Sequence, residues 1–254
     1  MKNKKIGIFI IAYRAVRTLV SAIERIPPDI KKKAEEIYVF DDCSDDNTYY
    51  AGLGYKHKNN VQKLKIYKNP KNLGYGGNQK KGYNYAIKKK FGIVVMLHGD
   101  VQYAPEYIPK LIKPLEEGKA DAVFGSRMLG HPLKGGMPLW KYFGNKFLTM
   151  LENFVLGTKL SEFHTGFRAY SVEALQKVPF NKSTDGYYFD TDIIIQFKLK
   201  GLRIAEIPIP THYGPESHKI SLTNSFIYGF NIFKSLYQYI LHTRNIKRIK
   251  KFEV

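Results

Sequence analysis

The sequence is poor in cysteine, in long apolar runs and in acidic residues, which number 22 against 41 lysines and arginines. Its single cysteine, Cys43, excludes a disulfide framework and a cysteine-based zinc site. No stretch approaches the ~20 consecutive apolar residues that a membrane-spanning helix needs. The apolar run after the basic N-terminus, Ile6 to Ala12, is too short and too β-branched for a signal peptide. We therefore expect a cytoplasmic protein in a reducing compartment.

Internal repeats, low-complexity tracts and Ser/Gly linkers are also missing from the sequence. The length of 254 residues and the hydrophobic content of 44% suffice for a substantial core. This composition excludes a coiled coil, a collagen-like chain and a disordered tail. It favours one large α/β domain with an appended C-terminal helix over two small domains.

The net charge of +19 attracts polyanions: nucleic acid, anionic lipid headgroups or phosphorylated small molecules. The lysine clusters at 31–33 and 88–90 are explained equally well by a solvated lysine-rich surface. A nucleic-acid-binding module is a distant alternative, because no helix-turn-helix, zinc-finger or RNP-like motif accompanies the charge. We therefore expect no nucleic-acid partner.

The third basic cluster closes an aromatic segment, Phe226 to Leu241, which is followed by Arg244 and the cluster at 247–251. An apolar aromatic helix with a basic tail is typical of membrane-surface elements. A helix packed on the core explains the same pattern, and the sequence does not separate the two. We expect a catalytic domain over 1–220 and a C-terminal amphipathic helix with a basic tail over 221–254, in peripheral contact with a membrane.

Short β-branched runs alternate with helical patterns in the first half of the chain. This rhythm predicts an α/β fold with a mainly parallel central sheet and helices on both faces. The expected strands are Lys5–Tyr13, Glu36–Phe40, Leu64–Lys68, Ile93–Leu97 and Ala120–Gly125, and the expected helices are Ala15–Ile26, Gly76–Lys90 and Pro105–Glu117. Ligands bind such sheets at the carboxyl ends of the strands, so chemistry is expected in the turns that follow them.

The second half is less regular. Glycines and prolines between 130 and 138 predict a loop over 126–138. The expected helices are Trp140–Leu156 and Asp190–Leu202, and Arg203–Pro210 is expected to be extended.

Two acidic turns follow predicted strands, at 41–48 and 98–102. In a parallel sheet both turns open on one edge, so Asp42 and Asp100 are expected to lie close together. Carboxylate and amide oxygens suit Mg²⁺ or Mn²⁺, which also bind substrate phosphates. Helix capping explains Asp46 and Thr48 better, and an ordinary Asx turn explains Asp100 equally well.

The segment 72–78 places several glycines, Gly74 among them, before a predicted helix. Such a turn permits close approach of a ligand, and a helix N-terminus favours anions. It fits neither the dinucleotide fingerprint nor the P-loop. A tight turn explains it as well.

Taken in order, six stretches resemble the family 2 glycosyltransferases, which have the GT-A fold, and among them the polyprenyl-phosphate (dolichol-phosphate) sugar synthases. The resemblance covers roughly 5–220, and its stretches are Ala12-Tyr13-Arg14, the turn 41–48, the turn 72–78, Asp100-Val101-Gln102, Gly125-Ser126-Arg127 and Thr165-Gly166-Phe167-Arg168. It implies a nucleotide-sugar donor and a divalent metal, Mg²⁺ or Mn²⁺.

The resemblance also implies roles for individual residues. Ala12 and Tyr13 correspond to the turn that holds the nucleobase, and Asp42 to the carboxylate at the nucleoside. Asp100 and Gln102 correspond to the turn that binds metal and diphosphate. The remaining correspondences are Arg127 near the acceptor phosphate, and Asp190 and Asp192 as an acidic pair near the acceptor.

Three positions depart from the family pattern. Arg14 replaces the usual asparagine, His98 replaces the first aspartate of the D-x-D-like turn, and Cys43 replaces a glycine. Asp100 is therefore the only carboxylate of its turn, and the donor base and sugar stay open.

Departure of a nucleoside diphosphate builds negative charge that a cation held by Asp100, with basic groups such as Arg127, Arg168, His218 or Lys219, would stabilise. The loop 212–220 resembles the family loop that closes over the diphosphate, although a solvated turn is the plain alternative. An acceptor phosphate needs no general base. An acceptor hydroxyl does, and Asp190 or Asp192 is then the candidate, although helix capping explains both aspartates too.

The function expected from this resemblance is an inverting, metal-dependent glycosyltransferase that moves a sugar to a polyprenyl (dolichyl or undecaprenyl) phosphate at the cytoplasmic face of the cell membrane. The alternative is an enzyme of the same fold that acts on a soluble or glycan hydroxyl in cell-surface polysaccharide synthesis. The sequence leaves the oligomeric state open.

Overall fold

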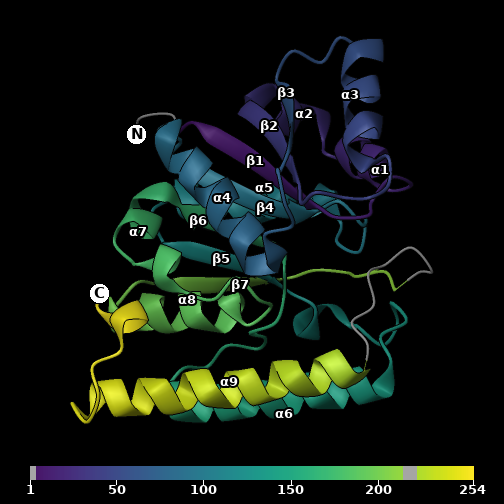
Figure 1. Ribbon diagram of the computed structural model, residues 1–254. Helices are drawn as coiled ribbons and strands as arrows, with labels where there is room; N and C mark the ends of the chain where they lie inside the picture. The colour runs from purple at the N-terminus through teal and green to yellow at the C-terminus, as the bar shows by residue number, and fades with distance from the viewer. Residues whose placement is uncertain (1–3, 214–221) are drawn as a thin grey trace.

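The computed structural model describes residues 4–213 and 222–254; His218 and Lys219 lie outside these residues. In the described part, a seven-stranded sheet has the order β3-β2-β1-β4-β6-β5-β7 (Figure 1). The strands are β1 (Ile6–Ala12), β2 (Ala34–Asp41), β3 (Leu64–Lys68), β4 (Ile93–His98), β5 (Ala122–Ser126), β6 (Arg168–Ser171) and β7 (Ile204–Pro208). The predicted α/β class with a mainly parallel sheet is confirmed.

Strand β6 is the exception, because it runs antiparallel to both β4 and β5. Its four residues begin with an arginine, so it carries too little periodicity to be predicted from sequence. Because β6 runs the other way, the segment before it lies at the edge where the parallel strands end, and the segment after it lies at the opposite edge.

The helices cover both faces of the sheet, as predicted. One hydrophobic core packs the sheet against α1, α2 and α5, and the other packs it against α4, α7 and α8. The helices are α1 (Leu19–Glu24), α2 (Pro28–Lys33), α3 (Thr48–Lys58), α4 (Gly74–Lys88), α5 (Ile108–Glu116), α6 (Leu139–Leu156), α7 (Val172–Gln176), α8 (Phe189–Leu199) and α9 (Leu222–Thr243), with short 3-10 turns at 105–107, 128–130, 180–182 and 250–252.

Two helical predictions need correction. The predicted helix over 15–26 contracts to α1, and Pro28 opens a second helix, α2, because proline is favoured in the first helical turn. Helix α3 was expected only as a capped start. The N-cap of α3 is Asn47, without a side-chain capping bond, so the expected capping role of Asp46 is wrong. Asp46, one residue earlier, accepts a hydrogen bond from the backbone N–H of Thr48 at 3.0 Å.

Helices α6 and α9 lie together along one edge of the molecule, beneath α8 in Figure 1. They pack on each other, and α9 also packs on α8. The predicted helices over 140–156 and 226–241 are thus confirmed. Within residues 4–213 and 222–254, no helix combines the length and the apolar character that crossing a bilayer requires.

The register of the sheet brings the C-terminal ends of β1, β2 and β4 to the same level. Ala12 at the end of β1 pairs with Asp41 of β2, and Ile11 pairs with His98 of β4. The turns that follow therefore leave the sheet side by side, which places the two acidic turns at one edge, as expected.

Candidate active site

A cavity of ≈ 910 Å³ lies at this edge. It opens between the ends of the parallel strands and the start of α6, and most of the predicted site residues line it. These are Ala12, Tyr13, Asp42, Gly74, His98, Asp100, Gln102, Arg127 and Asp190. Residues from six separate stretches of sequence thus meet in one place.

Asp42 is held rigidly at the wall of the cavity. Its carboxylate accepts hydrogen bonds from Asn69 Nδ2 at 2.8 Å and from the backbone N–H of Leu73 at 2.9 Å. Its own N–H donates to the carbonyl of Ala12 at 2.8 Å. These bonds tie the β2 turn to the β1 turn and to the start of α4.

The exposed residues of the β1 turn stand at the rim. Tyr13 lines the cavity and is 39% exposed. The Arg14 guanidinium lies 5.3 Å from its ring centroid and forms an exposed ion pair with Asp45. The arginine that replaces the family asparagine is thus engaged with both Asp45 and the Tyr13 ring.

The glycine-rich turn serves packing rather than ligand approach at most of its positions. A Cβ on Gly76 would lie 2.6 Å from the carbonyl oxygen of Thr184, and the Gly76 N–H donates to the carbonyl of Asp185 at 2.7 Å. The N-terminus of α4 is therefore partly covered by the loop before α8. Gly74 lines the cavity, at φ +77°.

The turn after β4 brings oxygen ligands into the cavity. Val101 takes φ 54°, which turns the chain sharply, and the Asp100 carboxylate accepts the N–H of Gln102 at 3.1 Å. The ring of His98 lies against Tyr103, with centroids 5.1 Å apart. A Cβ on Gly166 would lie 2.3 Å from His98 Nε2, so only glycine lets this ring occupy its position.

The donor set fits a divalent cation shared with a ligand. Asp100 and Gln102 supply a carboxylate and an amide oxygen from one turn. Among the described residues, no group of three His, Cys, Asp or Glu side chains is placed to hold a metal ion. Mg²⁺ and Mn²⁺ are commonly held by one or two carboxylates, while substrate phosphates and waters complete the shell.

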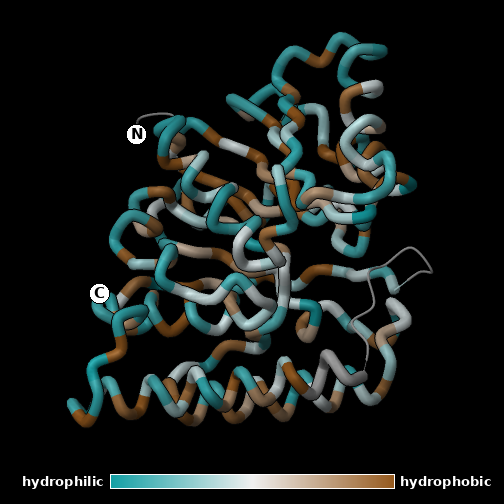
Figure 2. The backbone as a smooth tube through the Cα atoms, viewed as in Figure 1, coloured by the Kyte–Doolittle hydropathy of each residue, from teal (hydrophilic) through white to brown (hydrophobic). Residues whose placement is uncertain are grey.

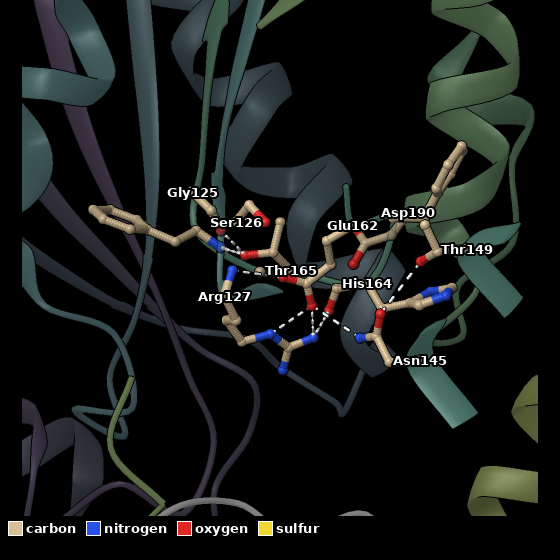
Figure 3. A network of polar contacts seen from close by, with 12 residues as sticks. Gly125, Ser126, Arg127, Asn145, Thr149, Glu162, His164, Thr165 and Asp190 are labelled. Atoms are coloured by element: carbon tan, nitrogen blue, oxygen red, sulfur yellow. Dashed lines mark hydrogen bonds and ion pairs between the residues drawn. The ribbon is translucent and has the colours of Figure 1, made fainter. Parts of the chain in front are cut away.

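Arg127 forms the opposite wall and is anchored by Glu162 (Figure 3). Its Nε donates to Glu162 Oε1 at 2.6 Å, its backbone N–H to Oε2 at 2.7 Å, and Nη2 to the carbonyl of His164 at 2.8 Å. Burial opposes ionisation of Glu162, but the Arg127 charge outweighs it and keeps the pKa of Glu162 below its ordinary value. The pair is ionised, and one edge of the guanidinium reaches Tyr213 at the cavity wall at 3.0 Å.

Lys141 adds a second positive charge, one that sequence reasoning missed. It lies in the first turn of α6 and lines the cavity, with Nζ 4.9 Å from the Tyr213 ring centroid. Burial, followed by repulsion from Arg127, lowers the pKa of Lys141 to about 8. Its position after a Gly/Pro loop gave no sign of this role.

Asp190 is fixed inside the cavity by three partners. Tyr75 donates to its Oδ2 at 3.0 Å, Gln79 donates to Oδ1 at 3.2 Å, and Arg168 lies 3.5 Å away. Arg168 is fully buried, does not line the cavity and holds the carbonyls of Phe163 and Thr165. The structure therefore places Arg168 behind Asp190, as its structural counter-charge.

Asp192 points away from the cavity. Lys251 donates to its Oδ1 at 2.6 Å and Ser235 donates to the same oxygen at 2.8 Å, so its partners come from α9 and the C-terminal segment. The acidic pair expected from sequence is thus divided between the site and the packing of α9. The basic tail is likewise not wholly free, because Lys251 is docked.

The cavity also has an aromatic and apolar wall that sequence reasoning missed. His164 links it together, with Nε2 3.1 Å from Glu152 of α6 and Nδ1 2.6 Å from the Tyr228 hydroxyl of α9. The other members of this wall are Tyr75, Tyr103, Pro138, Trp140, Leu148, Tyr187, Tyr213 and Tyr228. No local motif marks them, since they converge only through tertiary packing.

Comparison with known proteins agrees with this geometry. The family model described as Glycosyl transferase family 2 matches residues 8–179. An uncharacterised protein of Methanocaldococcus jannaschii is 31% identical over 204 residues, covering 77% of this chain and 84% of its own. The UDP-N-acetylglucosamine–dolichyl-phosphate N-acetylglucosaminyltransferase of Methanococcus voltae is 27% identical over 246 residues, covering 93% and 96%.

The fold also matches a solved structure. Glucosyl-3-phosphoglycerate synthase from Mycobacterium tuberculosis, crystallised with Mn²⁺, uridine diphosphate and phosphoglyceric acid, superimposes with a TM-score of 0.72 at 18% identity. The match covers 93% of this chain and 78% of that one. With the family match over most of the sequence, the chain belongs to glycosyl transferase family 2 and is a glycosyltransferase with the GT-A fold.

Proposed function

We propose that this enzyme transfers a sugar from a nucleoside-diphosphate sugar to a polyprenyl phosphate, with inversion at the anomeric carbon and dependence on a divalent metal. One observation carries the proposal. One cavity joins an oxygen-rich turn, the buried cation Arg127, the half-buried cation Lys141 and an apolar wall. These three surfaces match a diphosphate with its metal, an acceptor phosphate and the first part of a lipid chain.

The donor half lies at the ends of β1, β2 and β4. Tyr13 offers an aromatic face to the base, Ala12 shapes the turn beneath it, and the fixed carboxylate of Asp42 accepts hydrogen bonds from the nucleoside. Asp100 and Gln102 would hold the metal, with His98 beside them. When bound, the metal neutralises charge that develops on the departing diphosphate.

The acceptor half is formed by Arg127 and Lys141. Glu162 holds the guanidinium of Arg127, so this side chain is preorganised for an anion. A phosphate acceptor is already ionised, and its oxygen can attack the anomeric carbon without a general base. Asp190, held by Tyr75 and Gln79, then orients the sugar rather than taking up a proton.

Support for the acceptor comes from the Methanococcus voltae relative, whose name specifies dolichyl phosphate. A second candidate is a hydroxyl of a growing glycan, because Asp190 is a carboxylate in the cavity that can serve as a base. A low-salt glycan biosynthesis hexosyltransferase of Haloferax volcanii, 34% identical over 145 residues, supports that alternative; this chain spans 34% of it. With a polyprenyl phosphate as acceptor, we propose that the enzyme acts at the cytoplasmic face of the cell membrane.

The test is transfer of labelled sugar to a polyprenyl phosphate in detergent, with Mn²⁺ or Mg²⁺. We expect Asp100→Asn to reduce turnover by about a hundredfold or more, because it removes the metal carboxylate while preserving shape. Asp29→Asn, on the remote helix α2, is the matched control and should retain full turnover. Full turnover of Asp100→Asn would refute the metal role, and transfer only to glycan hydroxyls would favour the second candidate.

A further inference from the structure

Helices α6 and α9 expose an unusual number of large apolar side chains. Figure 2 shows hydrophobic residues recurring along both helices. More than half of the large apolar residues that are exposed in the described part of the chain lie on these two elements. They are Leu139, Trp140, Phe143, Phe147, Met150 and Phe154 on α6, and Ile227, Phe230, Phe233 and Tyr237 on α9.

These residues recur at helical spacing, so each set forms one stripe. Phe143, Phe147, Met150 and Phe154 follow one another at intervals of three or four residues, and Phe154 is 86% exposed. Phe230 is 72% exposed. The opposite sides of the helices are packed inward, with Glu152 and Leu156 of α6 and Ile232 and Leu236 of α9 buried. The stripes therefore lie outside the core, and clustered exposed apolar residues commonly mark interaction surfaces.

The charge around the stripes has one sign. Helix α9 contains no acidic residue, and the single one on α6, Glu152, is buried against His164 and Thr191. Lys146 and Lys234 are exposed on the two helices. Arg244 and Lys247, just after α9, are exposed as well. Aromatic side chains flanked by cations and free of carboxylates complement an anionic lipid surface.

The same two helices reach into the active-site cavity. Trp140, Lys141 and Leu148 of α6 line it, and so does Tyr228 of α9. Trp140 belongs both to the exposed stripe and to the cavity wall. The apolar surface is therefore continuous with the acceptor half of the site.

We infer that α6 and α9 together form a docking face for an anionic bilayer, into whose headgroup region their aromatic side chains insert. The sequence indicated such a contact for the C-terminal segment alone; the structure adds α6 as an equal partner and removes Lys251, which is docked on Asp192. The inference deepens the proposed function, because it names the surface from which a polyprenyl phosphate would be drawn into the cavity.

The test is flotation of the full-length chain with vesicles of phosphatidylcholine that contain or lack phosphatidylglycerol, without nucleotide or acceptor. We expect binding to the anionic vesicles at low salt. The variant Phe147→Ser/Phe154→Ser/Phe230→Ser should bind at least about tenfold more weakly, since burial of one phenylalanine is worth about a factor of ten. All three side chains are exposed, so the variant should stay folded.

Tyr50→Ser is the matched control, because Tyr50 is 64% exposed on α3, at the far end of the molecule. It should float like the wild type. Equal flotation of the triple variant and the wild type, or no flotation of either, overturns the inference. So does a stable dimer that the triple variant dissociates while neither protein binds vesicles, because the stripes would then be a subunit interface.

Failure of the docking face and failure of the proposed function give different results. If the wild type does not bind vesicles but glycosylates a polyprenyl phosphate in detergent, only the proposed docking face is refuted. A wild type that floats, and whose triple variant does not, but that transfers sugar only to soluble acceptors refutes only the proposed acceptor.

Discussion

At the scale of single residues, the two cations of the site differ in how firmly they keep their charge. Arg127 stays charged because a guanidinium does not lose its proton in the working pH range, and Glu162 fixes its position. Lys141, in the first turn of α6, has a pKa lowered to about 8, so it carries its positive charge mainly below that pH. Two adjacent positive groups therefore differ in how they respond to pH.

This difference predicts a pH dependence of acceptor use. As pH rises through about 8, Lys141 loses its proton, so kcat/KM for a phosphate acceptor should fall by about ten- to a hundredfold between pH 7 and 9.5. Lys141→Arg keeps its charge and should flatten the profile, whereas Lys141→Met should be flat and low. KM for the nucleotide sugar is the internal control and should change little. A wild-type profile shared by Lys141→Met would exclude this role.

Asp190 and Asp192 show what residue-level reasoning from sequence can and cannot supply. Both were expected near the acceptor. Residues two apart on a helix lie about 200° apart around its axis, so they cannot both face one cavity. The sequence does not indicate which face of α8 points to the cavity. The ion pairs of Arg168 with Asp190 and of Lys251 with Asp192 fix that orientation.

At the scale of elements, the C-terminal segment fastens α9 to the catalytic core. Lys251 donates to Asp192 and to Ser235 of α9, at 2.6 and 3.1 Å, and its carbonyl accepts from Gln196 of α8 at 2.8 Å. Phe252 beside it is fully buried. Asp192 also accepts the N–H of Thr184, in the loop that covers the start of α4.

Breaking this fastening should destabilise the fold. Lys251→Met leaves the Asp192 charge buried without its cation, and we expect the free energy of unfolding to fall by about 3 kcal/mol. Asp192→Asn/Lys251→Met should recover part of that loss. Urea denaturation measures both. Lys177→Met removes an exposed ion pair with Glu173 and should leave the free energy of unfolding nearly unchanged. A double variant no more stable than Lys251→Met would contradict the account.

Elements were predictable where their burial pattern is strong. Strands β1 to β5 lie within a few residues of their predicted bounds, since each is a compact apolar run between turn residues. Strand β6 was missed because its order comes from pairing with β4 and β5 on both sides. The oxygen-rich turns of the site were predicted by the same logic as the strands, because polar residues directly after a buried strand must lie at its end. Lys141, His164 and Tyr228 reach the cavity only through the packing of α6 and α9.

At the scale of the whole molecule, ligand binding should raise stability measurably. A nucleotide present at a hundred times its dissociation constant raises the free energy of unfolding by about 2.7 kcal/mol. For a chain of this size, that raises the melting temperature by about 5–10 °C. We expect one of UDP or GDP to give this shift with Mn²⁺ and a smaller one without it. Mn²⁺ alone should give little, since Asp100 and Gln102 supply only part of its shell. Equal shifts with and without metal would contradict the shared site.

The reversed strand β6 has a consequence for how this architecture tolerates change. Strands β4 and β5 end at the edge of the sheet that carries the site, whereas β6 begins there. The segment 162–168 leads into β6, and its residues contact both Arg127 and Asp190. Glu162 anchors one end of this segment and the buried Arg168 anchors the other, so its length is constrained. Lengthening or shortening it by one residue would shift one anchor against the other, so natural variants should differ here by substitution rather than by insertion or deletion.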